Sequence, residues 1–221
     1  MVNDAETLGI DPTDGHPERA LALSYAPRAA RAGVAAVFAL DATLARLALG
    51  TRDAMVAQLR LTWWYEALGD LAQGVVPAQP ILRTLRDEGA DAAALMKVAE
   101  GWELLLPAEI GDGDLEAFAA ARASVFNEAA RLAGARDDVS AAGRGWALAD
   151  LALRSAEPAR VAAATRLAMP SLQAAAAQRW SGAGRFLGAL VHVARADLAG
   201  AAPPGAPRRV ARLAWHRLTG R

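Results

Sequence analysis

Few side chains in this sequence belong to the types that carry out chemistry without a cofactor. There is no cysteine, so a thiol nucleophile, a thiolate zinc site, an iron–sulfur cluster and a disulfide scaffold are all excluded. The three histidines, His16, His192 and His216, leave little for an imidazole-rich metal centre. From these residue types we predict no metal site.

Phosphate-binding loops are also missing. The sequence contains neither GxxxxGK[ST] nor a GxGxxG that follows a strand. Gly182-Ala183-Gly184 precedes a predicted helix and has the composition of an anion cradle, but a tight turn between two helices needs the same residues. The 24 basic and 24 acidic residues balance, which argues against a nucleic-acid-binding protein.

The composition predicts that helices must position whatever site exists. Alanine makes up about a quarter of the residues, far above ordinary usage, and β-branched residues are few. Apolar residues recur at helical spacing between Gly and Pro breaks, and we expect helices over 115–132 and again after Pro170. The apolar runs are shorter than the roughly 18–20 residues of a membrane span, and no secretory signal is visible, so we predict a cytoplasmic protein.

The chain divides into three parts by pattern. Residues 1–16 are polar and rich in turn-forming residues, and we expect an irregular leader. Residues 17–200 carry the helical pattern and form the predicted domain. Residues 201–221 read as a linker followed by a basic helix. No acidic residue follows Asp197, and this helix suggests a peripheral contact with an anionic membrane or an acidic partner through Arg208, Arg209, Arg212, Trp215 and Arg217.

The predicted helix over residues 55–71 is unusual because it carries two adjacent tryptophans. Trp63 and Trp64 are offset by about 100° around a helix and cannot share one narrow stripe. We therefore expect a helix that is apolar over a wide arc and touches at least two neighbours. Arg60 lies beside that arc. Two interpretations stay open: large core rings with a locally paired arginine, or one wall of a ligand site.

This part of the sequence resembles the squalene/phytoene synthase family. The resemblance rests on Ala36–Leu40, Leu44–Leu47 and above all Gln58–Leu68, which contains Trp63-Trp64. It points especially to a divergent branch that includes mitochondrial complex I assembly factors. It implies an all-α, isoprenoid-synthase-type bundle of many helices around a central apolar cavity. The expected cavity and ligand-binding residues are Phe38, Asp41, Arg46, Arg60, Trp63 and Trp64.

Family enzymes join two prenyl diphosphates head to head with two DxxxD motifs that face each other across the cavity. Carboxylates at i and i+4 share a helix face, so they hold magnesium ions jointly. The ions neutralise the diphosphate leaving group, and apolar walls shelter the carbocation. An active family member therefore needs the aspartates of both motifs.

This sequence departs from the family at both motifs. The first would fall at Ala45–Leu49 and the second near Arg154–Ala159, and neither holds an aspartate pair. The one DxxxD present, Asp87–Asp91, contains Gly89 at a helix break, so we expect a solvated loop there.

The acids nearest to the two motif positions are Asp41, Asp150 and Glu157, and they form a fallback catalytic set if they converge in space. Arg46 would place positive charge where metal binding needs negative potential. We therefore expect no metal or other cofactor, or magnesium if the protein is an enzyme.

Three functions remain open from the sequence. The first is a non-catalytic binding or assembly protein with a prenyl or other lipid-like ligand, a protein partner, or both. The second is an active prenyl-diphosphate head-to-head transferase in isoprenoid biosynthesis with atypical magnesium ligands. The third is a helical adaptor whose cavity is filled by packed side chains. We prefer the first, because the scaffold resembles the family while the metal motifs are absent.

Overall fold

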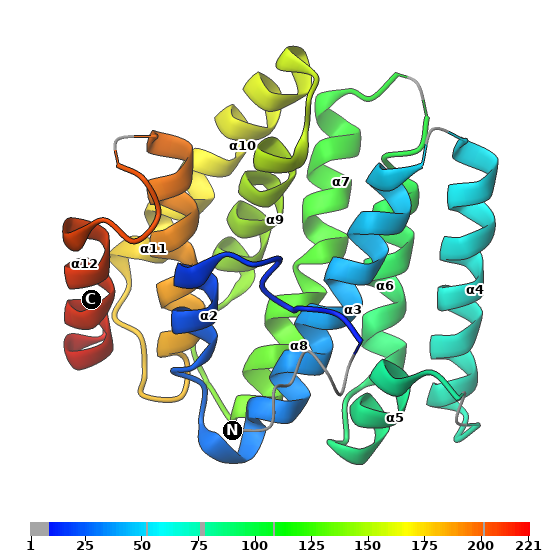
Figure 1. Ribbon diagram of the computed structural model, residues 1–221, viewed down its shortest axis with the longest axis horizontal. Helices are drawn as coiled ribbons and strands as arrows, with labels where there is room; N and C mark the ends of the chain where they lie inside the picture. The colour runs from blue at the N-terminus through cyan, green and yellow to red at the C-terminus, as the bar shows by residue number, and fades with distance from the viewer. Residues whose placement is uncertain (1–8, 52, 76–77, 108, 201) are drawn as a thin grey trace.

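The structure is a computed structural model that describes residues 9–51, 53–75, 78–107, 109–200 and 202–221. Within these ranges every regular element is a helix, which confirms the predicted all-α fold class (Figure 1). The helices are α2 (Pro17–Leu23), α3 (Arg31–Gly50), α4 (Ala54–Ala72), α5 (Pro80–Asp87), α6 (Ala92–Glu103), α7 (Asp112–Arg122), α8 (Ser124–Ala133), α9 (Ser140–Arg154), α10 (Pro158–Ala177), α11 (Arg185–Ala199) and α12 (Pro207–Thr219), with a 3-10 turn at Arg28–Ala30.

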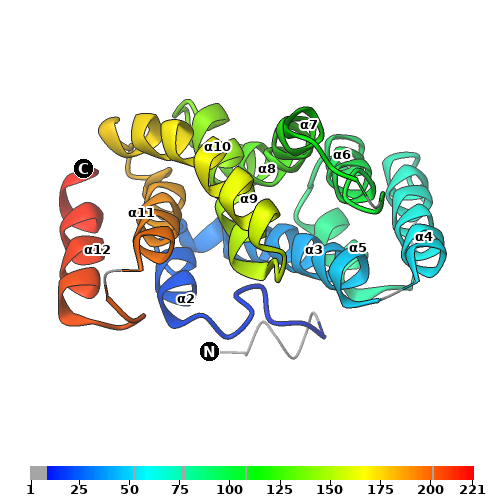
Figure 2. The same cartoon turned by 90° about the horizontal axis from the view of Figure 1, so that it is seen from above.

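Helices α3 and α9 form the centre of the bundle. Helix α3 packs against α4, α5, α6 and α8, and α9 packs against α7, α8, α10 and α11. Helices α4 and α12 lie at opposite ends of the long axis (Figure 2). The stretch Arg28–Gly50 has the length and apolar composition of a membrane span, but 67% of its most apolar window is buried inside the protein, as in a core helix.

Helix α4 is an edge helix that touches more than two neighbours, as predicted, but only part of its wide apolar arc is buried. It contacts α3, α5 and α6 through one face, which includes Leu61, Trp64 and Leu68. Its outer face exposes Met55, Leu59 and Trp63, with Trp63 48% accessible. The two tryptophans meet edge to face, with ring centroids 5.2 Å apart, so one is a core side chain and the other covers it from outside.

Two predicted helix limits also differ from the structure. The single helix expected over 115–132 is broken at Ala123 into α7 and α8, where α9 comes so close that a Cβ on Gly143 would lie 2.9 Å from the Cβ of Ala123. Pro170 lies inside α10 and does not restart a helix. The carbonyl of Arg166, which loses its usual amide donor, lies on the same exposed face and can be hydrated.

The packing of α9 on α10 depends on a glycine. A Cβ on Gly145 would lie 2.9 Å from both the backbone nitrogen and the Cγ of Leu172, so α10 would have to shift. We expect Gly145→Ala to lower the free energy of unfolding by about 1–3 kcal/mol, the usual cost of overpacking. Urea denaturation followed by circular dichroism measures this. Gly113→Ala is the control, because a Cβ there meets nothing within 4 Å; equal stability of the two variants would contradict the prediction.

Candidate functional site

A fully buried arginine lies between the two central aspartates of the sequence prediction. Arg122, at the end of α7, is 0% exposed. Its Nε and Nη2 donate to the two carboxylate oxygens of Asp41 on α3, at 2.8 and 2.6 Å. The same Nη2 donates to Oδ2 of Asp150 on α9 at 2.6 Å, and Nη1 donates to the carbonyl of Ala147 at 3.0 Å. One guanidinium thus joins three helices.

Aromatic rings enclose this guanidinium. Its central carbon lies 4.6 Å from the ring centroid of Trp102 and 4.4 Å from that of Trp146, within cation–π range. Trp102 also donates its indole N–H to Asp41 at 3.1 Å. Phe38 and Phe126 pack on Trp146 with centroids 5.5 and 5.1 Å away. The aromatic core therefore holds the ion pairs in place and excludes water from them.

Two further arginines complete the charge balance around Asp150. Arg19 of α2 lies 2.7 Å from its Oδ1, and Arg154 donates its Nε–H to Oδ2 at 2.7 Å and also pairs with Asp14. Burial disfavours the charged form of Asp150, but Arg122, Arg19 and Arg154 outweigh it and hold the pKa well below its usual range. Burial also opposes the charge of Arg122, whose pKa is nevertheless raised by Asp41 and Asp150. Three guanidiniums thus face three carboxylates, and the cluster is neutral.

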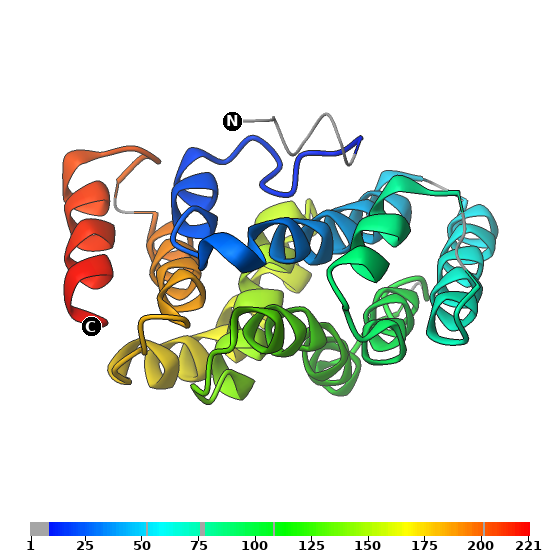
Figure 3. The same ribbon diagram turned by 90° about the horizontal axis from the view of Figure 1, so that it is seen from below.

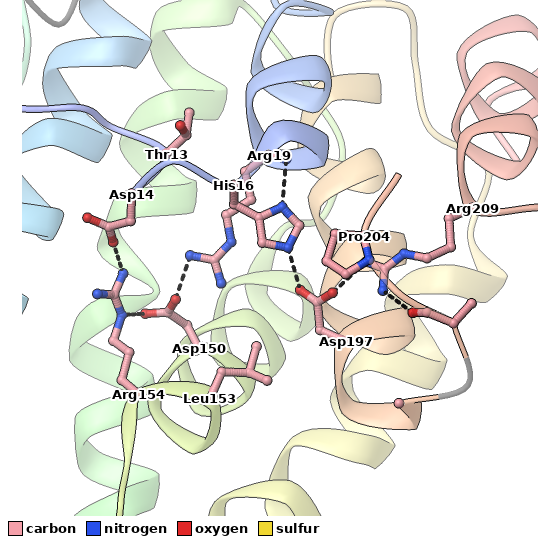
Figure 4. Close-up of a pocket in the computed structure, with 12 residues that line it drawn as sticks. Thr13, Asp14, His16, Arg19, Asp150, Leu153, Arg154, Asp197, Pro204 and Arg209 are labelled. Carbon is pink, nitrogen blue, oxygen red and sulfur yellow. Dashed lines mark hydrogen bonds and ion pairs between the residues drawn. The ribbon is translucent and has the colours of Figure 1, made fainter. Parts of the chain in front are cut away.

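Above Asp150 the surface opens into a pocket of about 440 Å³ (Figure 4). Its walls come from the segment before α2, from the ends of α9 and α11, and from the segment before α12. The charged groups in the walls pair with one another, as the dashed lines in Figure 4 show. The charges in the pocket walls are therefore already matched.

A second ion-pair cluster forms the other side of this pocket. Arg209 of α12 donates its Nε–H to Glu18 of α2 at 2.8 Å and its Nη2–H to Asp197 of α11. Burial disfavours the charged form of Arg209, but Asp197 and Glu18 raise its pKa. His16 accepts the backbone N–H of Arg19 at Nδ1, at 3.4 Å, and its Nε2 lies 3.3 Å from Asp197. Arg209, expected on an exposed basic face, is thus buried.

The residues at the two clusters do not fit the magnesium ions that family enzymes use. Asp41 and Asp150 share a guanidinium that already supplies the positive charge and occupies the space between them. His16, Glu18 and Asp197 offer ligand atoms within 4.8 Å of one another, but Arg209 pairs with both acids. A divalent cation at either place would have to displace a paired arginine, so we derive no metal-dependent step.

The sequence-predicted site residues are only partly brought together. Phe38 and Asp41 lie at the central cluster, and Trp64 is buried in the core. Arg46 and Arg60 are exposed on α3 and α4, and Trp63 faces outward. Among the fallback acids, Asp41 and Asp150 converge on Arg122. Glu157 is exposed at the start of α10 and pairs with Arg160 at 3.1 Å.

The central apolar cavity that the resemblance implies is filled where Phe38, Asp41 and Trp146 meet. The space left there is about 10 Å³, room for no more than one water molecule. The rings of Phe38, Phe126 and Trp146 occupy the volume, which explains the difference from the expectation.

Sequence reasoning missed Arg122, the residue that organises the site. A signal was present: Leu115, Phe118 and Arg122 recur at helical spacing on one stripe, and the first two are core residues. An arginine on a buried stripe requires a buried carboxylate on a neighbouring helix. Asp41 and Asp150 lie on apolar stripes of α3 and α9 in the same way.

Comparison with known proteins gives one match. The family model for squalene/phytoene synthase matches residues 13–101, which contain α2 to α5, most of α6, Asp41 and the Trp63-Trp64 segment. Arg122 and Asp150 lie outside the matched range. No curated protein and no solved structure matches the chain. From residue 13 to residue 101 the chain is therefore similar to the squalene/phytoene synthases, and this match supports that family for the protein.

Proposed function

We propose that this protein is a non-catalytic binding or assembly protein built on a squalene/phytoene synthase-like scaffold, akin to the branch that includes complex I assembly factors. One observation carries the proposal. The two central carboxylates, Asp41 and Asp150, are both bound to the buried side chain of Arg122. The scaffold thus uses its central acids for structure.

The energetics of this arrangement support a structural role. A carboxylate buried without a partner is strongly destabilising, whereas a fully hydrogen-bonded ion pair is tolerated. Arg122 uses Nε, Nη1 and Nη2 as donors, to Asp41, Asp150 and the Ala147 carbonyl. Releasing this side chain to admit a diphosphate and its metal ions would expose two carboxylates and break the aromatic enclosure.

One observation favours the alternative, an active magnesium-dependent prenyltransferase. Asp41 and Asp150 do lie together, with oxygens 2.6 Å from the same nitrogen, as two facing acids of a metal site would. That reaction requires Arg122 to leave its position. The same acids are therefore compatible with both functions, and a turnover assay distinguishes the two functions.

The decisive experiment is a turnover assay on the purified protein with magnesium and farnesyl or geranylgeranyl diphosphate. Pyrophosphate release and the organic-phase product are followed together, with a family enzyme as positive control. We expect neither pyrophosphate nor a head-to-head product above the protein-free background. We also expect the unfolding temperature to be the same with magnesium as with EDTA at equal ionic strength.

Metal-dependent formation of a head-to-head product would overturn the proposal. Asp41→Asn and Asp150→Asn would then be compared with Glu157→Gln, whose carboxylate is exposed and outside the cluster. Loss of turnover in the first two alone would place the chemistry at the Arg122 cluster.

A further inference from the structure

Helix α12 forms one end of the molecule (Figure 3) and exposes several of its large apolar side chains. It packs against α11, with Leu213 and His216 buried on the inner face. The opposite face exposes Trp215 and Leu218, which are 57% and 75% accessible. Ala211 and Ala214 continue this exposed stripe at helical spacing. A helix that packed only against its own protein would carry these residues inside.

Arginines flank the apolar stripe on both sides. Arg208 and Arg212 lie on the side toward α11, and Arg217 lies on the other, where its guanidinium stacks 4.7 Å from the ring of Tyr25. Within the described part of the chain none of these three arginines forms a salt bridge, although Arg209 between them forms two. The sequence after Asp197 contains no acid, so the positive charge of this face is not compensated locally.

A groove of about 270 Å³ lies between α11 and α12 beside these arginines. Val193, Ala196 and Leu213 give it an apolar floor, and Arg208 and Arg212 line it. Glu18 also reaches the groove, but its carboxylate is bound to Arg209. The groove thus offers cationic groups above an apolar base.

Buried His192 positions one of these arginines. Its Nε2 lies 3.4 Å from Nη2 of Arg212, and because arginine only donates, the imidazole must accept. Burial lowers the pKa of His192 to about 3, with His216, Arg212 and Arg195 contributing, so the ring is neutral and able to accept at ordinary pH. Arg212 is therefore held at the groove rather than free in solvent.

From this geometry we infer that α12 docks on an anionic phospholipid surface, with Trp215 and Leu218 inserted at the headgroup level and Arg208, Arg212 and Arg217 on lipid phosphates. An outward apolar stripe bordered by arginines is the arrangement of helices that lie in a membrane interface. Each arginine near an anionic surface contributes enough attraction for about a fivefold gain in binding. The groove accommodates one phosphate-bearing headgroup between Arg208 and Arg212. This surface does not depend on the proposed function, since it lies away from the Arg122 cluster.

The test is flotation of the full-length protein with vesicles of phosphatidylcholine alone or mixed with phosphatidylglycerol. We expect binding to the mixed vesicles only, and a loss of binding at high salt, because screening weakens the electrostatic part. Arg208→Gln/Arg212→Gln is expected to reduce binding by about twentyfold or more. Trp215→Ser/Leu218→Ser is expected to reduce it while the thermal unfolding temperature is retained.

The matched control is Leu59→Ser/Trp63→Ser, on the exposed face of α4 at the other end of the molecule. This variant should bind as the unaltered protein does. Absence of binding to anionic vesicles, binding that the α12 variants leave intact, or an equal loss in the α4 variant would each overturn the inference. A stable dimer that dissociates on Trp215→Ser/Leu218→Ser would overturn it as well, by showing that the stripe is a subunit interface.

Discussion

Replacing Arg122 by methionine is expected to destabilise the protein by about 3–5 kcal/mol, the cost of leaving buried carboxylates without their counter-ion. Asp41 loses its arginine partner altogether and keeps only the indole N–H of Trp102. Asp150 keeps Arg19 and Arg154, so most of the effect should come from Asp41. The methionine fills a similar volume between the Trp102 and Trp146 rings. The loss of stability therefore measures the missing positive charge more than a change in packing.

Equilibrium urea denaturation at neutral pH measures this change. Arg166→Met is the control, because Arg166 and Asp112 form an exposed pair, with side chains 59% and 55% accessible, and such pairs contribute at most about 1 kcal/mol. The triple variant Arg122→Met/Asp41→Asn/Asp150→Asn should recover part of the stability, since neutral side chains need no counter-ion. If the single variant were as stable as the control, the buried cluster would not be holding α3, α7 and α9 together.

The second large effect is expected at Arg209. Arg209→Met should lower the free energy of unfolding by a similar amount, about 3–5 kcal/mol, because Glu18 and Asp197 are both buried and both rely on this guanidinium. Arg209 also donates to the carbonyl of Ala202 at 3.2 Å, so the segment before α12 loses an anchor. We expect the substitution to speed amide exchange more in α12 than in α9, relative to the unaltered protein.

Urea denaturation measures the loss of unfolding free energy, and hydrogen exchange with mass spectrometry measures the local loosening of α12. Arg86→Met serves as the comparison, since the Arg86–Asp87 pair is more than half exposed. Uniformly faster exchange across α9 and α12 would mean that the variant lowers global stability without loosening α12 locally, and would contradict the anchoring role.

The fold was predictable from the sequence because its signals are local. Asp91 is the N-cap of α6 and accepts the N–H of Ala94 at 3.0 Å, and Pro158 is the first residue of α10, both positions that these residue types favour. The break at Ala123 and the continuation through Pro170 were not predictable, because each depends on what surrounds the chain. Ala123 meets Gly143 of another helix, and Pro170 faces water.

The candidate site was predictable only in part, because helical spacing is local in the sequence and the contacts of the site are not. The resemblance directed attention to Phe38 and Asp41, which do lie at the centre. It also directed attention to Arg46, Arg60 and Trp63, which lie on the outside, because a sequence pattern fixes helical spacing but not which face meets a neighbour. Arg122 escaped because its partners are 81 and 28 residues away in the chain. Only the packing of α3, α7 and α9 brings them together.

The pairing of Glu18 with Arg209 has a consequence for synthesis. These residues are 191 positions apart, so the carboxylate on α2 stays without its cation until the ribosome has passed residue 209. Contacts of such long sequence separation form late, after the entropy of closing the loop has been overcome. Helix α2 therefore completes its docking only after the other helices have been made. During synthesis the nascent chain exposes the apolar surface that α2 later covers, and that is the interval in which chaperones would hold it.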